Sequence, residues 1–364
     1  MKCGIVGLPN VGKSTLFNCL SNNTKALVAN YRFCTIDPNV GTVSVPDPRL
    51  NKLEELIEPE RVVPAVVEIV DIAGLVKGAS KGVGLGNQFL ANIRETNAII
   101  HVLRCFQNEN ITHEEGTIDP VRDKEIIDIE LQLKDLETIE KKLDKSKRAA
   151  KAGNKDEQLV VSVLEKLRSF IEEGKNAREF ETDSITEPVI SELQLLTFKP
   201  IMYVCNVDEK SAKEGNEYVE KVKEKVKDEK AEVIVLAAQI EADISELETY
   251  EERQIFLEEL NLNEPGVNRL IRQAYKLLNL QTYFTAGVKE VRAWTIEKGW
   301  TAPQAAGVIH TDFEKGFIRA EVISYNDFLT YGSEAKVKEA GKLSVEGKEY
   351  IVNDGDIIHF RFNV

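Results

Sequence analysis

The chain reads GLPNVGKS at residues 7–14, which matches the phosphate-binding pattern G-x-x-x-x-G-K-[ST]. Residues 2–6 before it are typical of a short buried strand, and residues 15–20 after it are typical of the start of a helix. In that setting the glycines let the backbone close around phosphate oxygens, and the helix N-terminus adds partial positive charge. The sequence therefore predicts an α/β protein that binds a nucleoside triphosphate.

Two side chains of this loop have roles that follow from the pattern itself. Lys13 is expected to reach the β- and γ-phosphates, and the Ser14 hydroxyl is expected to hold Mg²⁺. A chance match in a glycine-containing turn is the alternative, and the predicted strand–loop–helix setting argues against it.

The composition of the 364 residues is that of an ordinary soluble protein, with 42% hydrophobic and 30% charged residues. No stretch approaches the roughly 18 apolar residues of a membrane span, and the first strand begins too early for a secretory signal. Five scattered cysteines without a C-x-x-C pair favour reduced thiols in a cytoplasm. The formal charge of −14 argues against a generally basic nucleic-acid-binding protein, and we expect no DNA partner, but the charge leaves room for a local basic patch.

Short β-branched runs indicate a parallel sheet that is interrupted along the chain. The runs lie at residues 66–70, 98–103, 200–205 and 232–236. We assign a nucleotide-binding domain to residues 1–124 and 196–279, an inserted helical hairpin to residues 125–195, and a compact α+β module to residues 280–364.

Near-heptad spacing of apolar residues predicts the two arms of the hairpin, with Gly153-Asn154 at the turn. The apolar positions are Ile129, Leu133, Leu136 and Leu143 in the first arm and Leu159, Val160, Val163, Leu164, Leu167, Phe170 and Ile171 in the second. Basic residues crowd around this turn with only Asp144 against them: Lys141, Lys142, Lys145, Lys147, Arg148, Lys151 and Lys155. A solvated hairpin tip is one interpretation, and a contact for RNA phosphates is the other.

Two further segments are expected to complete the phosphate and magnesium site. Residues 71–74 read Asp-Ile-Ala-Gly after a predicted strand, a form typical of a γ-phosphate sensor. In that role Asp71 supports Mg²⁺ and the Gly74 amide bonds the γ-phosphate. Thr35 is the candidate for a second Mg²⁺ hydroxyl ligand, unless it is an ordinary loop threonine.

The base-recognition segment differs from that of guanine-specific proteins, which carry Asn-Lys-x-Asp. In those proteins the carboxylate accepts from guanine N1–H and the N2 amino group, and the lysine stem packs along the base. Here residues 206–209 read Asn-Val-Asp-Glu, so Val207 replaces the lysine and Glu209 the aspartate. Because each lost charge-assisted hydrogen bond is worth about 1.5–3 kcal/mol, the sequence disfavours GTP.

Taken together, these segments resemble the YchF / Obg-like ATPase family over essentially the full chain. The matching stretches are GLPNVGKST at 7–15, NYRFCTIDPNVG at 30–41, DIAGLVKGASKGVGLGNQFLANIRE at 71–95, NVDE at 206–209, LNLQTYFTAGVKEVRAWT at 278–295, DFEKGFIRAEVISY at 312–325 and VNDGDIIHFRFNV at 352–364. The resemblance implies a P-loop GTPase-like parallel sheet, an inserted α-helical coiled-coil hairpin and a C-terminal TGS domain, which is a ubiquitin-like β-grasp. It also implies a preference for ATP despite GTPase ancestry, and association with ribosomes.

Site residues follow from the same resemblance. The implied nucleotide contacts are Asn10, Val11, Gly12, Lys13, Ser14, Thr15, Asn206, Val207 and Glu209. The implied magnesium ligands are Ser14, Thr35 and Asp71. Residues 237–239 read Ala-Ala-Gln where related proteins place a Ser-Ala-Lys base loop, which leaves the contacts there open.

Hydrolysis needs a group that orients the attacking water, and Leu75 stands where small GTPases carry a glutamine for this purpose. The resemblance implies His113 as the catalytic group, with Lys13 and Gly74 acting on the phosphates; a surface-loop histidine is the alternative reading of His113. Asn10 in addition suggests a K⁺ ion as a fixed positive charge near the phosphates.

Two functions remain open from the sequence. One is a slow Mg²⁺-dependent ATPase in the cytoplasm, whose nucleotide gates ribosome binding through the hairpin tip and the TGS domain and which regulates translation or the stress response. The other is a regulatory binding protein that uses ATP as an allosteric ligand with little turnover. Leu75 favours the second, and the full set of Mg²⁺ ligands favours the first.

Overall fold

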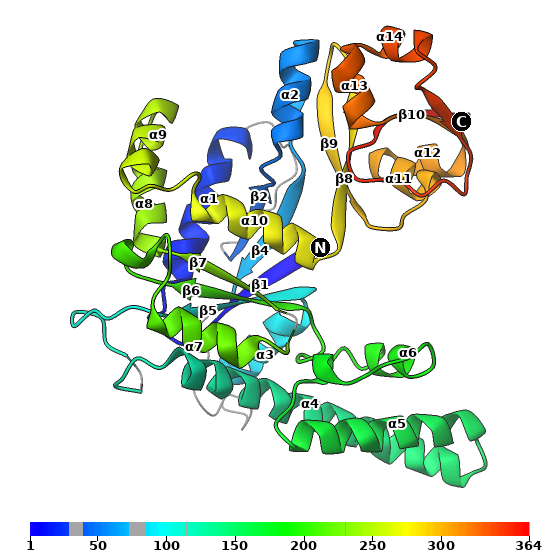
Figure 1. The fold of residues 1–364 in the computed structure, drawn as a ribbon. Coiled ribbons are helices and arrows are strands. Elements are labelled where there is room, and N and C mark those ends of the chain that lie inside the picture. The colour runs from blue at the N-terminus through cyan, green and yellow to red at the C-terminus, as the bar shows by residue number, and fades with distance from the viewer. Residues whose placement is uncertain (29–38, 73–84, 114, 230, 364) are drawn as a thin grey trace. The chain divides into compact units, whose positions relative to one another are not determined.

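The computed structural model describes residues 1–28, 39–72, 85–113, 115–229 and 231–363 (Figure 1). Thr35, Gly74 and Leu75 lie outside the described residues. The chain divides into two compact units, a first unit of residues 1–41 and 68–270 and a second unit of residues 42–67 and 271–364. Among the described helices, none is long and apolar enough to cross a membrane.

The first unit is built on a six-stranded sheet in the order β2-β4-β1-β5-β6-β7. Its strands are β2 (Val40–Ser44), β4 (Val66–Asp71), β1 (Lys2–Val6), β5 (Ala98–Arg104), β6 (Ile201–Asn206) and β7 (Glu232–Leu236). From β4 to β7 every neighbouring pair is parallel. β5 and β6 are buried along their whole length, as expected for strands covered on both faces. The interrupted parallel sheet predicted from the sequence is confirmed.

Helices cover this sheet on both faces (Figure 1). The covering helices are α1 (Lys13–Val28), α3 (Leu85–Arg94), α7 (Glu217–Val226), α8 (Ala238–Glu246) and α10 (Gly266–Leu277), whereas α9 (Tyr250–Glu259) follows α8 and extends away from the sheet. Because neighbouring strands are parallel, the carboxyl ends of β1, β4, β5, β6 and β7 meet at one edge of the sheet. In α/β proteins ligands bind at that edge.

The inserted segment forms two packed helices, α4 (Pro120–Lys151) and α5 (Lys155–Glu172), followed by α6 (Thr186–Ser191) (Figure 1). α4 begins before the predicted residue 125, because the Asp119 side chain accepts the N–H groups of Val121 and Arg122 and because Pro120 suits the first helical position. At the turn Gly153 has φ +97°, a conformation that favours glycine.

The predicted heptad seam is wrong in the first half of α4. Ile129 and Leu133 are 52% and 41% exposed, whereas the carboxylate of Asp135 is buried. Asp135 accepts the backbone N–H groups of Leu196 and Thr197 at 2.7 and 2.8 Å. This part of α4 therefore packs through Ile127 and Leu131, which are buried, and through the polar contacts of Asp135, which the spacing of apolar residues cannot indicate.

The second unit contains a mixed sheet in the order β11-β10-β12-β8-β9-β3. Its strands are β11 (Ser344–Glu346), β10 (Phe317–Ile323), β12 (Ile357–Phe362), β8 (Leu280–Ala286), β9 (Val291–Glu297) and β3 (Val62–Val63). Four helices accompany them: α11 (Ala302–Ile309), α12 (Thr311–Lys315), α13 (Tyr325–Tyr331) and α14 (Glu334–Glu339). β8 and β9 form an antiparallel hairpin, and β12 returns parallel to β8 and antiparallel to β10. This arrangement fits the predicted β-grasp.

Residues 42–67 group with the second unit, although the sequence placed them in the domain of residues 1–124. They contain α2 (Pro48–Ile57) and β3, which pairs in parallel with β9. Arg49 forms an ion pair with Asp354 at 2.8 Å and lies 5.3 Å above the ring of Phe284. No shift in composition marks this segment, so neither composition nor spacing indicates the grouping.

Candidate nucleotide-binding site

The phosphate-binding loop connects β1 to α1 and requires glycine at a point of close approach. Gly12 has φ +98°, and a Cβ atom there would lie 2.4 Å from the side-chain nitrogen of Asn206. The Lys13 ammonium donates to the carbonyl oxygen of Leu8 at 2.7 Å, so it lies over the loop. The loop therefore places a cation and a helix N-terminus together, as phosphate binding needs.

Two of the predicted magnesium ligands lie together. The Ser14 hydroxyl donates to Oδ2 of Asp71 at 3.3 Å. The other oxygen, Asp71 Oδ1, is buried and has no hydrogen-bond partner among the described residues. A buried carboxylate oxygen without a donor is costly unless a cation or water meets it, and Mg²⁺ prefers such oxygen ligands. The pair therefore fits a magnesium ion, while Thr35 falls outside the described ranges.

A cavity of about 590 Å³ opens at the carboxyl edge of the sheet, a size typical of small-molecule sites. Its lining residues are Asn10, Gly12, Lys13, Ser14, Thr15, Phe106, Gln107, Asn108, Ile111, Asn206, Val207, Asp208, Glu209, Ala238 and Gln239. The structure thus brings the residues predicted for the phosphates, apart from the buried Val11, to the same cavity as those predicted for the base.

One wall of this cavity was missed by the sequence reasoning, and it comes from the loop after β5. Phe106, Gln107, Asn108 and Ile111 line it. Arg104, which is 1% exposed, holds this loop through its guanidinium group. It donates to the carbonyl oxygens of Phe106, Asn108 and Ile111 at 3.3, 3.1 and 3.0 Å. This loop follows the carboxyl end of a predicted parallel strand, and that position alone could have indicated that it lines a ligand site.

The altered base motif follows β6 in the cavity wall. Asn206 donates from Nδ2 to the Val11 carbonyl oxygen and accepts at Oδ1 from the Ala238 N–H, both at 2.9 Å. Asn206 therefore connects the phosphate-binding loop to the start of α8. The sequence predicted Asn206 only as a nucleotide contact and did not indicate this structural role. Val207 is 4% exposed and packs within the wall, whereas Glu209 is exposed.

His113 is not the surface residue that the alternative interpretation described, because it is only 9% exposed. Its Nε2 lies 2.8 Å from Oδ2 of Asp123 on α4. The neighbouring Thr112 accepts at its carbonyl oxygen from Nδ2 of Asn10 at 3.2 Å. The predicted catalytic histidine thus lies one residue from a contact with the phosphate-binding loop.

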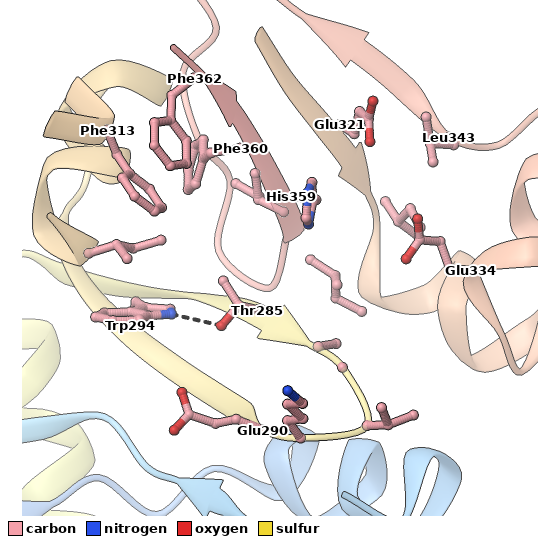
Figure 2. Close-up of a pocket in the computed structure, with 18 residues that line it drawn as sticks. Thr285, Glu290, Trp294, Phe313, Glu321, Glu334, Leu343, His359, Phe360 and Phe362 are labelled. Carbon is pink, nitrogen blue, oxygen red and sulfur yellow. Dashed lines mark hydrogen bonds between the residues drawn. The ribbon is translucent and has the colours of Figure 1, made fainter. Parts of the chain in front are cut away.

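A second cavity, of about 600 Å³, lies in the second unit (Figure 2). Figure 2 shows aromatic side chains at one end of it, among them Trp294 and Phe313, and carboxylates at the other, among them Glu321 and Glu334. None of the predicted site residues that the structure describes lines this cavity.

Known proteins resemble this chain along its whole length. A family model described as "50S ribosome-binding GTPase" matches residues 2–142, and the model YchF-GTPase_C, described as "Protein of unknown function (DUF933)", matches residues 280–363. The chain is 57% identical to the "Ribosome-binding ATPase YchF" of Escherichia coli O157:H7, covering 100% of this chain and 99% of that protein. It is 55% identical to the protein of that name in Bacillus subtilis, covering 100% of both. It also resembles the solved "Structure of the Schizosaccharomyces pombe YchF GTPase", with a TM-score of 0.91 and 39% identity over 99% of this chain and 97% of that one.

Proposed function

Because this chain belongs to the YchF family, we propose that it is a Mg²⁺-dependent ATPase that hydrolyses ATP to ADP and phosphate and binds the ribosome under control of its nucleotide. The names of its relatives include both ATPase and GTPase, so the names alone do not decide which nucleotide this chain prefers. One observation supports ATP over GTP. In the part of the cavity wall expected to contact the base, Val207 and Glu209 stand where guanine-specific proteins carry lysine and aspartate.

We infer that neither carboxylate of the motif reads guanine. Asp208 accepts the N–H of Ser211 at 3.0 Å, where it caps the 3₁₀ turn η3 (Glu209–Ser211). Glu209 is exposed and carries one more methylene than the aspartate of guanine-specific proteins. Val207 offers an apolar surface but no lysine stem for the base. These features support a base without the guanine N1–H and N2 donors, namely adenine.

Binding of fluorescent ATP and GTP in Mg²⁺ and KCl, with hydrolysis of each, tests this choice. We expect ATP to bind at least tenfold tighter, a difference of about 1.4 kcal/mol. The double variant Val207→Lys/Glu209→Asp restores the guanine motif and should shrink or reverse that ratio, whereas Val207→Ile should keep it. Tighter binding of GTP to the unaltered chain would overturn the proposal.

Three residues described above would bind the phosphates and the magnesium ion. Lys13 would exchange the Leu8 carbonyl oxygen for oxygens of the β- and γ-phosphates, and Ser14 and Asp71 would hold Mg²⁺. When bound, the ion neutralises charge that develops on the phosphate oxygens. By family resemblance, Thr35 supplies a further Mg²⁺ ligand and the Gly74 amide a γ-phosphate contact.

A K⁺ ion near the phosphates is a second electrostatic aid that we propose, with Asn10 as its ligand. Nδ2 of Asn10 donates to Thr112, which leaves the side-chain oxygen available for a cation. Turnover should therefore fall when NaCl replaces KCl, and Asn10→Ala should lose that difference. Equal turnover in the two salts would remove K⁺ from the proposal.

Ribosome binding is assigned to the hairpin tip and to the second unit. At the tip Lys142 pairs with Glu192 at 2.9 Å and Lys147 with Glu165 at 2.8 Å. The other tip cations are exposed and form no ion pair within the described part of the chain: Lys141, Lys145, Arg148, Lys151 and Lys155. Exposed cations of this kind favour RNA phosphates. The carboxylates around the cavity of Figure 2 favour ribosomal protein over RNA at that face of the second unit.

Cosedimentation with ribosomes at several salt concentrations tests the tip. Removing two phosphate contacts with Lys145→Ala/Arg148→Ala should weaken binding and lower the slope of log K against log salt by about 1–2. Lys210→Ala/Lys213→Ala is the charge-matched control, because both lysines are exposed and lie outside residues 125–195. Equal loss in the two variants would assign the effect to overall charge.

The alternative function is a regulatory protein that holds ATP as an allosteric ligand with little turnover. The occupation of both ring nitrogens of His113 favours it, because Nδ1 must first lose the Glu115 N–H before it can take a proton from water. Turnover measured with and without ribosomes separates the two, since negligible hydrolysis in both conditions would select the alternative. In either case we propose that the protein acts with ribosomes in the cytoplasm and regulates translation or the stress response.

A further inference from the structure

His113 is held at both ring nitrogens. Nε2 lies 2.8 Å from Oδ2 of Asp123, and Nδ1 accepts the backbone N–H of Glu115 at 3.1 Å. Because Nδ1 accepts a hydrogen bond, the proton of the neutral ring is on Nε2, which donates it to Asp123. The contacts therefore fix one tautomer and one orientation of the imidazole.

Asp123 is itself firmly placed for this contact. It lies in the first turn of α4, is 1% exposed, and accepts at Oδ1 from Nη2 of Arg122 at 3.0 Å. Arg122 is fixed in turn by Thr117, whose hydroxyl and carbonyl oxygens accept at 2.9 and 2.6 Å. A carboxylate with both oxygens engaged can hold a histidine ring in place, as carboxylates do for histidines in other sites.

The residues just before His113 connect it to the nucleotide cavity. Thr112 accepts from the Asn10 side chain in the phosphate-binding loop at 3.2 Å. Ile111 lines the cavity, and Arg104 donates to its carbonyl oxygen at 3.0 Å. His113 therefore lies between the cavity and the first turn of α4.

We propose that Asp123 is a positioning residue for hydrolysis, which holds His113 at Nε2 so that Nδ1 serves as the general base. In the structure the N–H of Glu115 occupies that lone pair, and loss of this one bond frees it while Asp123 keeps the ring. The water oxygen then attacks the γ-phosphorus, its proton passes to Nδ1, and the bond from the γ-phosphorus to the β–γ bridging oxygen breaks. Asp123 stabilises the imidazolium that forms. This inference rests on the proposed ATPase function.

Asp123→Asn tests the proposal in the full-length chain. The change keeps the shape but replaces one carboxylate oxygen with an NH₂ group, so Nε2–H loses its fixed acceptor and the imidazolium loses the charge that stabilises it. We expect kcat to fall at least tenfold with the Kd for ATP unchanged, because Asp123 does not line the cavity. Asp119→Asn is the matched control: it alters the cap of the same helix, and asparagine caps as well as aspartate. Wild-type or faster turnover of Asp123→Asn overturns the proposal, and faster turnover would make Asp123 a restraint on His113.

A spectroscopic readout separates positioning from a merely structural role. Two-bond ¹H–¹⁵N correlations of the histidine rings report which nitrogen carries the proton, and His113→Gln identifies the signals of His113. In the wild type the Nε2–H tautomer of His113 should predominate, and in Asp123→Asn it should no longer predominate. Reduced turnover with an unchanged tautomer overturns the proposal.

His113→Gln also distinguishes the catalytic role of His113 from the positioning role of Asp123. Wild-type turnover in His113→Gln would overturn the catalytic role of His113 and, with it, the role of Asp123. Wild-type turnover in Asp123→Asn, with turnover lost in His113→Gln, would leave the ATPase function standing and overturn the positioning role alone.

Discussion

Substitution of two glycines with nearly the same backbone conformation isolates the role of close packing in the nucleotide site. Gly12 has φ +98° and Gly153 has φ +97°. An added Cβ meets nothing within 4 Å at Gly153, whereas at Gly12 it lies 2.4 Å from Nδ2 of Asn206. Gly12→Ala and Gly153→Ala therefore share a backbone cost and differ in the displacement of Asn206.

The contacts around each glycine give the free-energy cost of its substitution. Placing alanine in such a conformation costs about 1–3 kcal/mol at either position. In Gly12→Ala the side chain of Asn206 must move, which breaks its bonds to Val11 and Ala238, both 2.9 Å long. At about 0.5–1.5 kcal/mol for each bond, the cost of Gly12→Ala rises to about 2–6 kcal/mol.

Thermal unfolding and ATP titration measure the difference. For a unit of this size each kcal/mol lowers Tm by about 2–4 °C, so Gly12→Ala should lose roughly twice as much Tm as Gly153→Ala. We expect Gly153→Ala to bind Mg²⁺–ATP with the wild-type Kd, and Gly12→Ala to bind at least tenfold more weakly, because the displaced Asn206 no longer ties the phosphate-binding loop to α8. Wild-type ATP affinity in Gly12→Ala, or an equal loss of Tm in both variants, would refute this reasoning.

Three further predictions concern pH, a buried carboxylate and magnesium. Burial lowers the pKa of His101 from 6.5 to about 3. Between these values only the unfolded chain takes up the proton, so stability falls as pH decreases. From pH 7 to pH 5 the wild type should lose about 2 kcal/mol more than His101→Phe in thermal unfolding, with the exposed His359→Phe as control. Asp135→Ala leaves two buried N–H groups without an acceptor and should cost about 2–5 kcal/mol, with hydrogen exchange at those amides rising in parallel. EDTA should abolish hydrolysis, and Asp71→Asn should raise the Mg²⁺ concentration needed for half-maximal turnover roughly tenfold; an unchanged requirement would exclude Asp71 as a ligand.

Sequence reasoning predicted the geometry best where the residues involved are adjacent along the chain. The phosphate-binding loop and the D-x-x-G segment each occupy a few consecutive positions, and β1 and β4 are short apolar runs that lead directly into them. Because neighbouring parallel strands end at one edge, Ser14 and Asp71 could be expected near each other, and their side chains are 3.3 Å apart.

It failed where burial is polar and partners are distant along the chain. Apolar periodicity predicted Leu133 in the hairpin seam, but Asp135 takes the buried place because the N–H groups it accepts lie about sixty positions away. Arg49 and Asp354 pair across an even longer separation. Such contacts need the tertiary fold to bring the partners together, so neither spacing nor composition indicates them.

The loop between β5 and α4 gives nucleotide-gated ribosome binding a path that needs only the first unit. Thr112 contacts the phosphate-binding loop through Asn10, and the next residue, His113, is bonded to Asp123 in the first turn of α4. α4 has 32 residues, which at 1.5 Å per residue gives a rod of about 48 Å with the basic tip at its far end. A phosphate group that draws Asn10 away from Thr112 would therefore act on the first turn of the helix that presents the cations. If gating follows this path, Asn10→Ala should make ribosome affinity equal in the ATP and ADP states, while Lys145→Ala/Arg148→Ala should weaken binding in both states and keep their ratio. A preserved nucleotide dependence in Asn10→Ala would place the gate elsewhere.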